Sequence, residues 1–231
     1  MSATFTNDWI SYVNKLLYRG VGTLPAANKF RLCASESATL TRASSLADFI
    51  KAELKPEFGY NRASVVWAEN GAYSNVNQRH ELPTTTARWT ADGATLQFRT
   101  VFLLANAHSK AAEVFTPANV SGSVINIAGN VLSNGDTVIP IANPGSTLPG
   151  NLVSGDAYTV LNVNGGNFHF SSDGINPIVL SNTGSGSFQL RYATGSVVLL
   201  QVEPLVISLQ PGQPLEYDID LAGLSTAYGG T

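Results

Sequence analysis

The side chains best suited to nucleophilic or acid–base chemistry are sparse and scattered in this sequence. The three histidines, His80, His108 and His169, lie in different segments, and no Gly-x-Ser-x-Gly sequence occurs among the many serines. A Ser-His-Asp triad needs a nucleophile, a base and an orienting acid, and the nucleophile often carries a local signature. Two carboxylates that meet in the fold could cleave a glycoside, but nothing in the pattern favours this. We expect that the protein is not an enzyme.

Patterns that bind metals or phosphates are also missing. The sequence has neither His-x-x-x-His nor Glu-x-x-His spacing, and Cys33 is its one cysteine, so no cysteine-based metal site is predicted. Asp136, Asp156 and Asp173 each stand alone beside a glycine, whereas a calcium loop needs several closely spaced oxygen ligands. These three residues are therefore predicted to form turns. Neither a Walker-type loop nor a Gly-x-Gly-x-x-Gly loop occurs, and no cofactor is predicted.

Aromatic rings are the remaining candidates for contact with a ligand. Exposed rings can stack on sugars, but in β proteins large aromatic side chains more often fill the core or anchor an interface. The candidate rings are those of Trp9, Trp67, Trp89, Tyr60, Tyr73, Tyr158 and Phe168.

Low charge and abundant turn formers dominate the composition. Charged residues make up 13% of the 231 residues, and apolar residues make up 44%. The usual charged share is about a quarter. Together with 21 glycines and 11 prolines, this is typical of a turn-rich β protein and not of a disordered chain, which would be charged and poor in aromatic residues. The length suits one large β domain or two smaller ones.

The charges are divided unevenly along the chain. Residues 1–110 hold 12 basic and 8 acidic residues, a net charge of +4, whereas residues 111–231 hold Arg191 and 8 acidic residues, a net charge of −7. Two interpretations stay open: ordinary solvated surfaces, or complementary faces for head-to-tail contacts between subunits. The basic residues are spread singly and not clustered, so no nucleic-acid binding is predicted.

The N-terminus and the apolar runs predict neither secretion nor a membrane span. MSATFTNDW lacks the basic and apolar regions of a signal peptide. The apolar runs VFLLA and VVLL are far shorter than the roughly 20 residues of a membrane helix. We expect a protein that is made and folded in a cytosol and does not bind membranes.

The periodicity of apolar residues predicts two helices followed by strands. NDWISYVNKLLYRG (7–20) predicts a short helix capped by Asn7 or Asp8, and SSLADFIKAELKP (44–56) predicts a second helix. Apolar and acidic residues alternate in PLEYDIDLAG (214–223), which predicts a strand with one core face and one solvent face. SVVLLQV and LVISL are predicted as two strands separated by Pro204.

The middle of the chain differs in texture and is predicted to be an insertion. Turn sequences such as NGD, NPG, SGD and NTGSG are dense there, and no Lys or Arg occurs from Ala111 to Leu190. We predict a host domain of residues 1–113 plus 194–231 and an inserted small β module of residues 114–193. The predicted fold is all-β: an antiparallel β-sandwich of jelly-roll or immunoglobulin-like type, with two short N-terminal helices and the inserted domain.

Three phrases, taken in order, carry a family resemblance. They are SLADFIKAELKPEFGYNRASVVWA, ARWTADGATLQFRTVFLLANA and ATGSVVLLQVEPLVISLQPGQPLEYDIDL. This order resembles a family of small structural proteins of tailed bacteriophages. Gly59, Tyr60 and Arg62 match the Gly-Tyr-x-Arg step of that family, ATGSVVLL matches its Gly-rich hairpin, and PGQPLEYDIDL matches its last turn and strand.

The predicted insert is similar to a small β module that is common in phage virion proteins. The module runs Leu-Ser-x-Gly-Asp, a strand, Leu-Pro-x-x-Leu, Tyr-x-Val and Asn-x-Phe-x-x-Ser. The matching positions here are Leu132, Ser133, Gly135, Asp136, Leu148, Pro149, Leu152, Tyr158, Val160, Asn167, Phe168 and Ser171. Together the two resemblances cover nearly the whole chain.

The resemblance implies a structural component of a tailed phage virion that acts through protein–protein assembly. Capsid decoration or cement proteins and tail, baseplate or fibre components are all implied, made in the host bacterial cytoplasm and located in the virion. The implied partners are further copies of this chain, as a homo-oligomer, and other virion proteins such as major capsid or tail and baseplate proteins. Phe5 and Trp9 are predicted interface residues, because these large apolar groups near the N-terminus have little to pack on locally.

A second hypothesis is a glycan-binding, receptor-recognition module on the virion surface. In that case the insert would be the binding tip, and Tyr158 and Phe168 would stack on the sugar.

Overall fold

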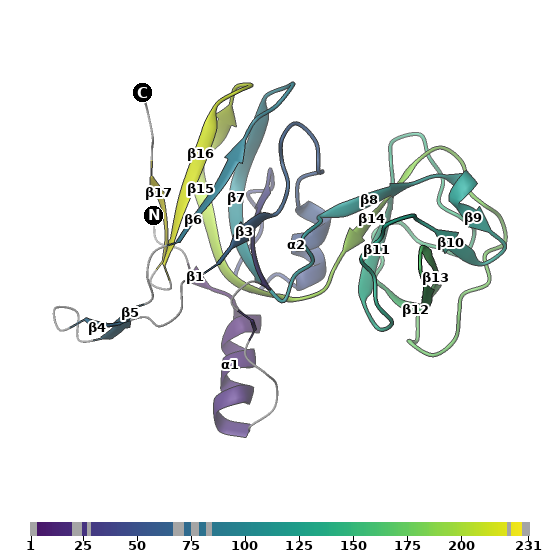
Figure 1. Cartoon of the computed structure of the whole chain (residues 1–231), viewed down its shortest axis with the longest axis horizontal. Helices are drawn as coiled ribbons and strands as arrows, with labels where there is room; N and C mark the ends of the chain where they lie inside the picture. Colours follow the sequence, from purple (N-terminus) through teal and green to yellow (C-terminus); the bar gives the residue numbers. More distant parts are fainter. Residues whose placement is uncertain are drawn as a thin grey trace. The chain divides into compact units, whose positions relative to one another are not determined.

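The chain folds into two compact units. The computed structural model describes residues 4–19, 25–26, 29–66, 72–74, 79–81, 85–220 and 223–227. The first unit comprises Met1–Ser109 with Gly195–Thr231, and the second comprises Lys110–Thr194 (Figure 1). The second unit thus begins at Lys110, where the sequence pattern predicted 114, and it ends at Thr194, where the pattern predicted 193.

The first unit is built on antiparallel sheets. The five-stranded sheet has the order β1 (Thr4–Phe5), β15 (Ser196–Leu209), β7 (Leu96–Ala105), β2 (Phe30–Ser35), β3 (Ala63–Val65). The three-stranded sheet has the order β17 (Gly223–Ala227), β16 (Pro214–Asp220), β6 (Thr85–Thr90), and β4 (Ala72–Ser74) pairs with β5 (Arg79–Glu81). The described α-helices are α1 (Asn7–Arg19) and α2 (Leu46–Ala52). The predicted all-β antiparallel fold with two N-terminal helices is confirmed.

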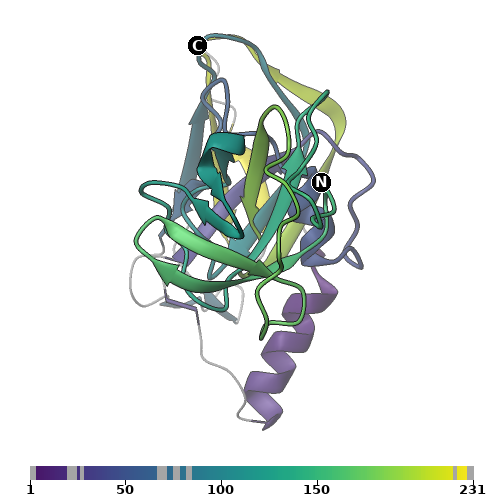
Figure 2. The ribbon, with the colours of Figure 1, turned by 90° about the vertical axis from the view of Figure 1, so that its right-hand side faces the viewer.

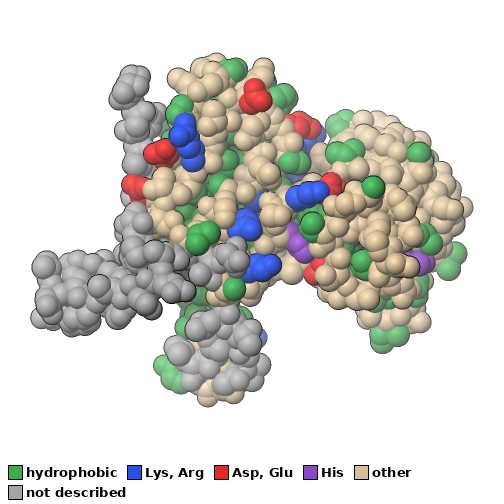
Figure 3. Space-filling model, in the orientation of Figure 1, with side chains coloured by type: hydrophobic (Ala, Val, Ile, Leu, Met, Phe, Trp, Pro, Cys, Tyr) green, Lys and Arg blue, Asp and Glu red, His purple; other side chains and the backbone are tan. Residues whose placement is uncertain are grey.

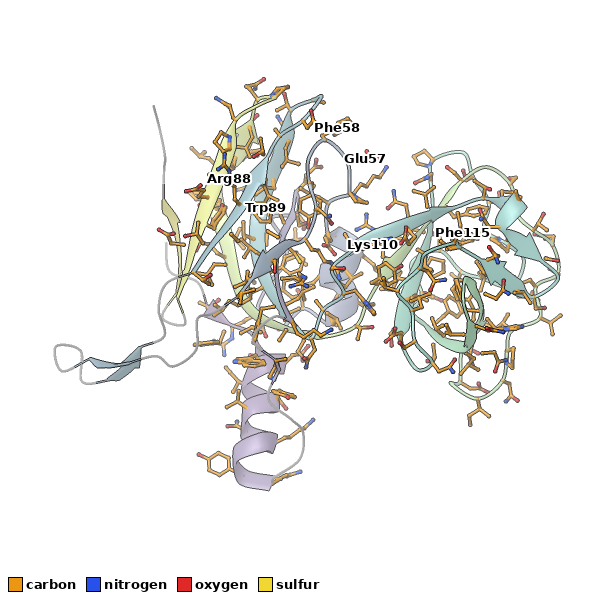
Figure 4. The ribbon with its side chains drawn as sticks, viewed as in Figure 1. Glu57, Phe58, Arg88, Trp89, Lys110 and Phe115 are labelled. Carbon is orange, nitrogen blue, oxygen red and sulfur yellow. The ribbon has the colours of Figure 1, made fainter. Side chains whose placement is uncertain are left out.

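Aromatic side chains pack the two sheets of the first unit together. The ring of Trp89 on β6 lies 5.7 Å from that of Phe98 on β7 and 5.9 Å from that of Tyr217 on β16, both edge-on. Arg88, the neighbour of Trp89, lies on the opposite, exposed face of β6 (Figure 4). Edge-on contacts of this kind add to the stabilisation that aromatic burial gives.

The predicted alternation along β16 is confirmed for the side chains that the structure describes. Leu215, Tyr217 and Ile219 are buried, and Glu216 is exposed and lies 3.6 Å from Arg88 of the neighbouring strand. The Asp220 and Leu221 side chains, which belong to the same prediction, lie outside the described set.

A buried ion pair joins the end of α2 to the segment before β3. Arg62 donates from Nε to Glu53 Oε1 at 2.9 Å and from Nη2 to Glu53 Oε2 at 2.7 Å, and both side chains are fully buried. The Tyr60 hydroxyl donates to the same carboxylate at 2.9 Å and accepts from the backbone N–H of Ala34 on β2 at 3.1 Å. Burial and the nearby Glu53 raise the pKa of Tyr60 well above its ordinary value, so its hydroxyl stays a donor.

Gly59 of the Gly-Tyr-x-Arg step is required by a close backbone approach. Its φ is +82°, in the left-handed region, and a Cβ at this position would lie 2.0 Å from the carbonyl oxygen of Thr90. The preceding residue, Phe58, accepts a hydrogen bond on its carbonyl from the N–H of Asp92 at 2.9 Å. The loop is therefore held directly against the end of β6, and Figure 4 labels Phe58 on it.

The second unit is a seven-stranded antiparallel sheet whose strands curve around a core of their own (Figure 2). Its order is β8 (Ala112–Phe115), β14 (Phe188–Tyr192), β11 (Thr137–Ala142), β12 (Tyr158–Asn164), β13 (Asn167–Ser171), β10 (Val124–Asn126), β9 (Val120–Ser121). The fully buried core side chains include Phe115, Ile125, Val138, Val160, Phe168, Phe188, Leu190 and Tyr192.

The second unit is inserted into a hairpin of the first. Ala105 at the end of β7 pairs with Ser196 at the start of β15, and the chain leaves and returns between them. Inside the second unit, the entering strand β8 and the leaving strand β14 pair as well, with Phe115 opposite Phe188. Adjacent entry and exit points allow a domain to be added without disturbing its host.

Substitutions on the two faces of β16 test the core of the first unit. We expect Tyr217→Asp to unfold this unit, because an unpaired carboxylate at a fully buried site costs several kcal/mol. Glu216→Lys, which exchanges one end of an exposed ion pair, should change the unfolding free energy by no more than about 0.5 kcal/mol. Urea unfolding followed by tryptophan fluorescence measures both. Equal destabilisation by the two changes would contradict the assignment of faces.

Removing one partner of the buried ion pair should be far more costly than removing an exposed arginine. We expect Arg62→Met to destabilise the first unit by about 3–5 kcal/mol, because the Glu53 carboxylate would stay buried without its partner. Arg88→Met is the matched control, with an expected loss of at most about 1 kcal/mol. Denaturant midpoints at neutral pH give both values, and similar values for the two variants would refute the role of the buried pair.

Candidate protein-docking surface

The two predicted interface residues lie together at the start of the described chain. Phe5 belongs to β1, which pairs with Leu199 and Leu200 at one edge of the five-stranded sheet. Trp9 lies in the first turn of α1, which packs next to β15 and runs away from the sheet edge (Figure 1). Sequence reasoning thus selected two neighbouring residues, although their role in an interface stays a prediction.

Thr6 fixes the junction between β1 and α1. Its backbone N–H donates to the carbonyl of Val198 at 3.1 Å, and its hydroxyl donates to the carbonyl of Val197. The same hydroxyl accepts from the N–H of Trp9 at 3.3 Å, as the residue that caps a helix does. The sequence predicted Asn7 or Asp8 as the cap, and this was wrong by one position or more, because Asn7 is already helical.

A second tie holds the start of α1 to a loop. The N–H of Asn7 donates to the carbonyl of Arg42 at 3.0 Å, and Arg42 Nε donates to Asn7 Oδ1 at 3.1 Å. The first turn of α1 is therefore fixed from two sides, by β15 through Thr6 and by this loop.

The apolar side chains of α1 that the structure describes are only partly covered by the rest of the described chain: Trp9, Tyr12 and Val13 are half-buried. Among the side chains of α1 that the structure describes, none is fully buried. Trp9 stacks on Tyr12 with ring centroids 5.3 Å apart, Ile10 is 41% exposed and Tyr18 is 82% exposed. A helix with an apolar stripe normally buries that stripe against a core, so apolar residues that stay partly exposed on it are typical of an interaction surface.

Two adjoining hollows shape this surface. The first, about 220 Å³, is mostly apolar, and its described lining residues are Phe5, Trp9, Ile10, Val13 and Asn14. We name it the N-terminal hollow.

The second hollow, about 630 Å³, shares Ile10 and Asn14 with the first. Lys15, Arg19 and Arg42 contribute three positive charges to its lining, and we name it the basic groove. An apolar hollow beside a cationic groove fits a partner that presents an apolar group next to an acidic one.

The rings predicted to stack on a sugar do not reach the surface. Phe168 is 0% exposed and Tyr158 is 6% exposed, and both belong to the core of the second unit. The Tyr158 hydroxyl accepts a hydrogen bond from the N–H of Val153 at 2.8 Å. The prediction of these two rings as glycan-binding residues was wrong, because the curvature of the sheet turns their faces inward.

The other candidate residues do not converge on a site in the described part of the chain. Cys33 is buried, and burial raises the pKa of its thiol well above the ordinary value, which disfavours the reactive thiolate. His108 and His169 belong to different units, while Trp67 and the side chains of Tyr73 and His80 fall outside the described set.

The Asp173 carboxylate is engaged by its own turn. It accepts hydrogen bonds from the backbone N–H and side-chain amide of Asn176, from the N–H of Ile175 and from the Ser171 hydroxyl, at 2.8 Å each. These bonds hold its pKa well below the ordinary value. Within the described residues, no three His, Cys, Asp or Glu side chains gather as a metal site would require.

Comparison of the chain with models of known protein families, with curated proteins and with solved structures found no match. Among the helices in the described residues, none has the length and apolar character needed to cross a bilayer.

Removing the Thr6 hydroxyl should loosen the docking surface. Thr6→Val keeps the shape of the side chain but leaves the Val197 carbonyl and the Trp9 N–H without this partner. We therefore expect the free energy of unfolding to fall by about 1–2 kcal/mol. Thr86→Val, which removes an exposed hydroxyl bonded to Asp218, is the control and should cost no more than about 0.5 kcal/mol. Urea unfolding compares the two. An equally small effect at Thr6 would show that the junction is not held in this way.

Proposed function

We propose that this chain is a structural component of a tailed-bacteriophage virion that assembles through the docking surface on β1 and α1. Its place is in capsid decoration or cement, or in the tail, baseplate or fibre. The observation that carries the assembly part of the proposal is the partly exposed apolar surface at the start of α1, where Ile10 is 41% exposed and the first turn is fixed by Thr6 and Arg42. The resemblance of the sequence phrases to phage structural proteins supports the virion part.

The residues that carry the resemblance have structural roles in the first unit. Gly59 allows the close approach to β6, and Tyr60 and Arg62 both bind the buried Glu53 carboxylate. Because this motif stabilises the fold and does not itself bind a partner, members of one family could share the motif and still dock at different places on a particle.

The second unit supports a role as an exposed or packed building block. Asp136, Asp156 and Asp173 are spread through its turns, and its visible face in Figure 3 is mostly uncharged polar side chains and backbone. A surface with little charge repels its neighbours weakly and is prone to associate. In a particle with many copies in close contact, such a surface avoids the cost of stripping water from charges.

Deletion of residues 2–9 tests the proposal. We expect the truncated chain to be lost from particles purified by density gradient, because β1, the Thr6 anchor and Trp9 are all removed. The isolated truncated protein should still melt cooperatively, because β15 keeps its pairing with β7. Quantitative mass spectrometry of the particles measures incorporation, with Glu216→Lys as a full-length control.

Two results would count against this function. If the wild-type chain is missing from purified particles, the virion role fails. If the truncated chain is incorporated at the wild-type level, the docking surface is not the part that assembles.

A further inference from the structure

Strand β15 carries a large and unusual bulge, beyond the two residues that pair with the edge strand β1. Val202 is paired with Thr100, and the next pair is Ile207 with Phe98, so four residues of β15 lie opposite the single residue Arg99. A common β-bulge adds one residue. We name Glu203–Val206 the β15 bulge.

The β15 bulge presents aliphatic side chains to solvent. Leu205 is 77% exposed and Val206 is 55% exposed, and Pro204 beside them is exposed as well. A single exposed aliphatic residue is ordinary on a protein surface. A projecting cluster of such residues is not. Bulges often serve to direct a side chain to a place where it is needed.

The bulge is fixed in shape before any partner arrives. Arg99 Nε donates to the carbonyl of Glu203 at 3.2 Å, and Arg99 Nη2 donates to the carbonyl of Pro204 at 3.1 Å. Gln201 Nε2 donates to the Glu203 carboxylate at 2.6 Å. Because these bonds and the proline ring already restrict the backbone, little conformational entropy would be lost when the bulge is bound.

The N-terminal hollow is concave where the β15 bulge is convex, and both are mostly apolar. It is a shallow, open depression of about 220 Å³. Four of its described lining side chains, Phe5, Trp9, Ile10 and Val13, are apolar, so an aliphatic occupant would remove apolar surface from water, which is favourable.

We propose that two copies of this chain associate by placing the β15 bulge of each in the N-terminal hollow of the other. Charge bears on this partner. Glu203 is the acidic residue of the bulge, the Arg99 cation beside it is engaged with the bulge carbonyls, and Lys15, Arg19 and Arg42 line the basic groove next to the hollow. An apolar group beside a carboxylate would meet an apolar hollow beside cations.

The positions of the two features favour a two-fold axis. Leu200 pairs with β1 beside the hollow, and Leu205 lies five residues farther along the same strand, within roughly 17 Å at about 3.3 Å per residue. Two features on one edge can each meet their counterpart on a second copy at the same time, which is the self-complementary arrangement of a two-fold dimer.

The inference rests on the docking role proposed above and names a second copy as the partner of the N-terminal hollow. Sedimentation equilibrium of the purified protein, from micromolar to near-millimolar concentration, tests it without particles. We expect a dimer for the wild type, and a dimerisation constant weakened about thirty-fold or more by Leu205→Glu and by Ile10→Glu, the loss typical of a central contact. Val179→Glu, at a residue of the second unit that is 72% exposed, should have no effect.

Disulfide trapping tests the contact itself. A mixture of the Leu205→Cys and Ile10→Cys variants should form disulfide-linked dimers on mild oxidation, because one of the two contacts in a mixed dimer then holds both a bulge thiol and a hollow thiol. A mixture of Leu205→Cys and Val179→Cys should not, and Cys33 is buried and so does not compete.

Three outcomes would overturn the proposed contact, and a fourth would overturn its two-fold symmetry. The three are a wild-type monomer over the whole concentration range, a dimer unaffected by both glutamate substitutions, and equal trapping in the control mixture. A monomer would mean that the bulge serves to block edge-to-edge pairing of β15. If the purified chain is monomeric but is present in particles, the dimer is rejected and the virion role is retained. A trimer or larger ring would reject the two-fold arrangement.

Discussion

The packing of the first unit depends on the buried ion pair of Glu53 and Arg62. Burying two charges is costly unless the charges pair with each other. The end of α2 and the segment before β3 can therefore be buried together only in the position that pairs Glu53 with Arg62. Tyr60 extends that constraint to β2 through the N–H of Ala34. Trp89 extends it to β6, because its indole N–H donates to the carbonyl of Asn61 at 2.7 Å. Elements that are far apart in sequence are thereby fixed by one carboxylate.

The sequence predicted what depends on local periodicity and missed what depends on distant partners. The alternation along β16 and the two helices are local patterns, and the structure has them. The sequence predicted two strands separated by Pro204, but β15 is one strand with a bulge, because Arg99 on another strand satisfies the displaced carbonyls. Glu53 carries no local signal for the ion pair it forms nine residues before Arg62.

The same reasoning explains the error at Tyr158 and Phe168. Phe168 and Phe170 lie two residues apart on β13, as Tyr158 and Val160 do on β12, so each pair shares the face of its strand that alternation predicts to be buried. The Phe168 ring lies 5.5 Å from that of Phe170 on the same strand, and Tyr158 lies 5.7 Å from Phe170 across the sheet. Turns rich in glycine, which were predicted, allow the strands to curl until these rings form a common core.

The N-terminal surface joins two kinds of binding at one helix. A helix of 13 residues is marginal in isolation, and α1 is held mainly at its first turn, by Thr6 and Arg42. A second copy seated in the N-terminal hollow would pack against Ile10 and Val13 and so stabilise the turns that follow. The basic groove lies on those same turns and shares Ile10 and Asn14 with the hollow. Because the proposed dimer brings Glu203 of the second copy towards these same cations, any other acidic group would compete with the dimer for the groove.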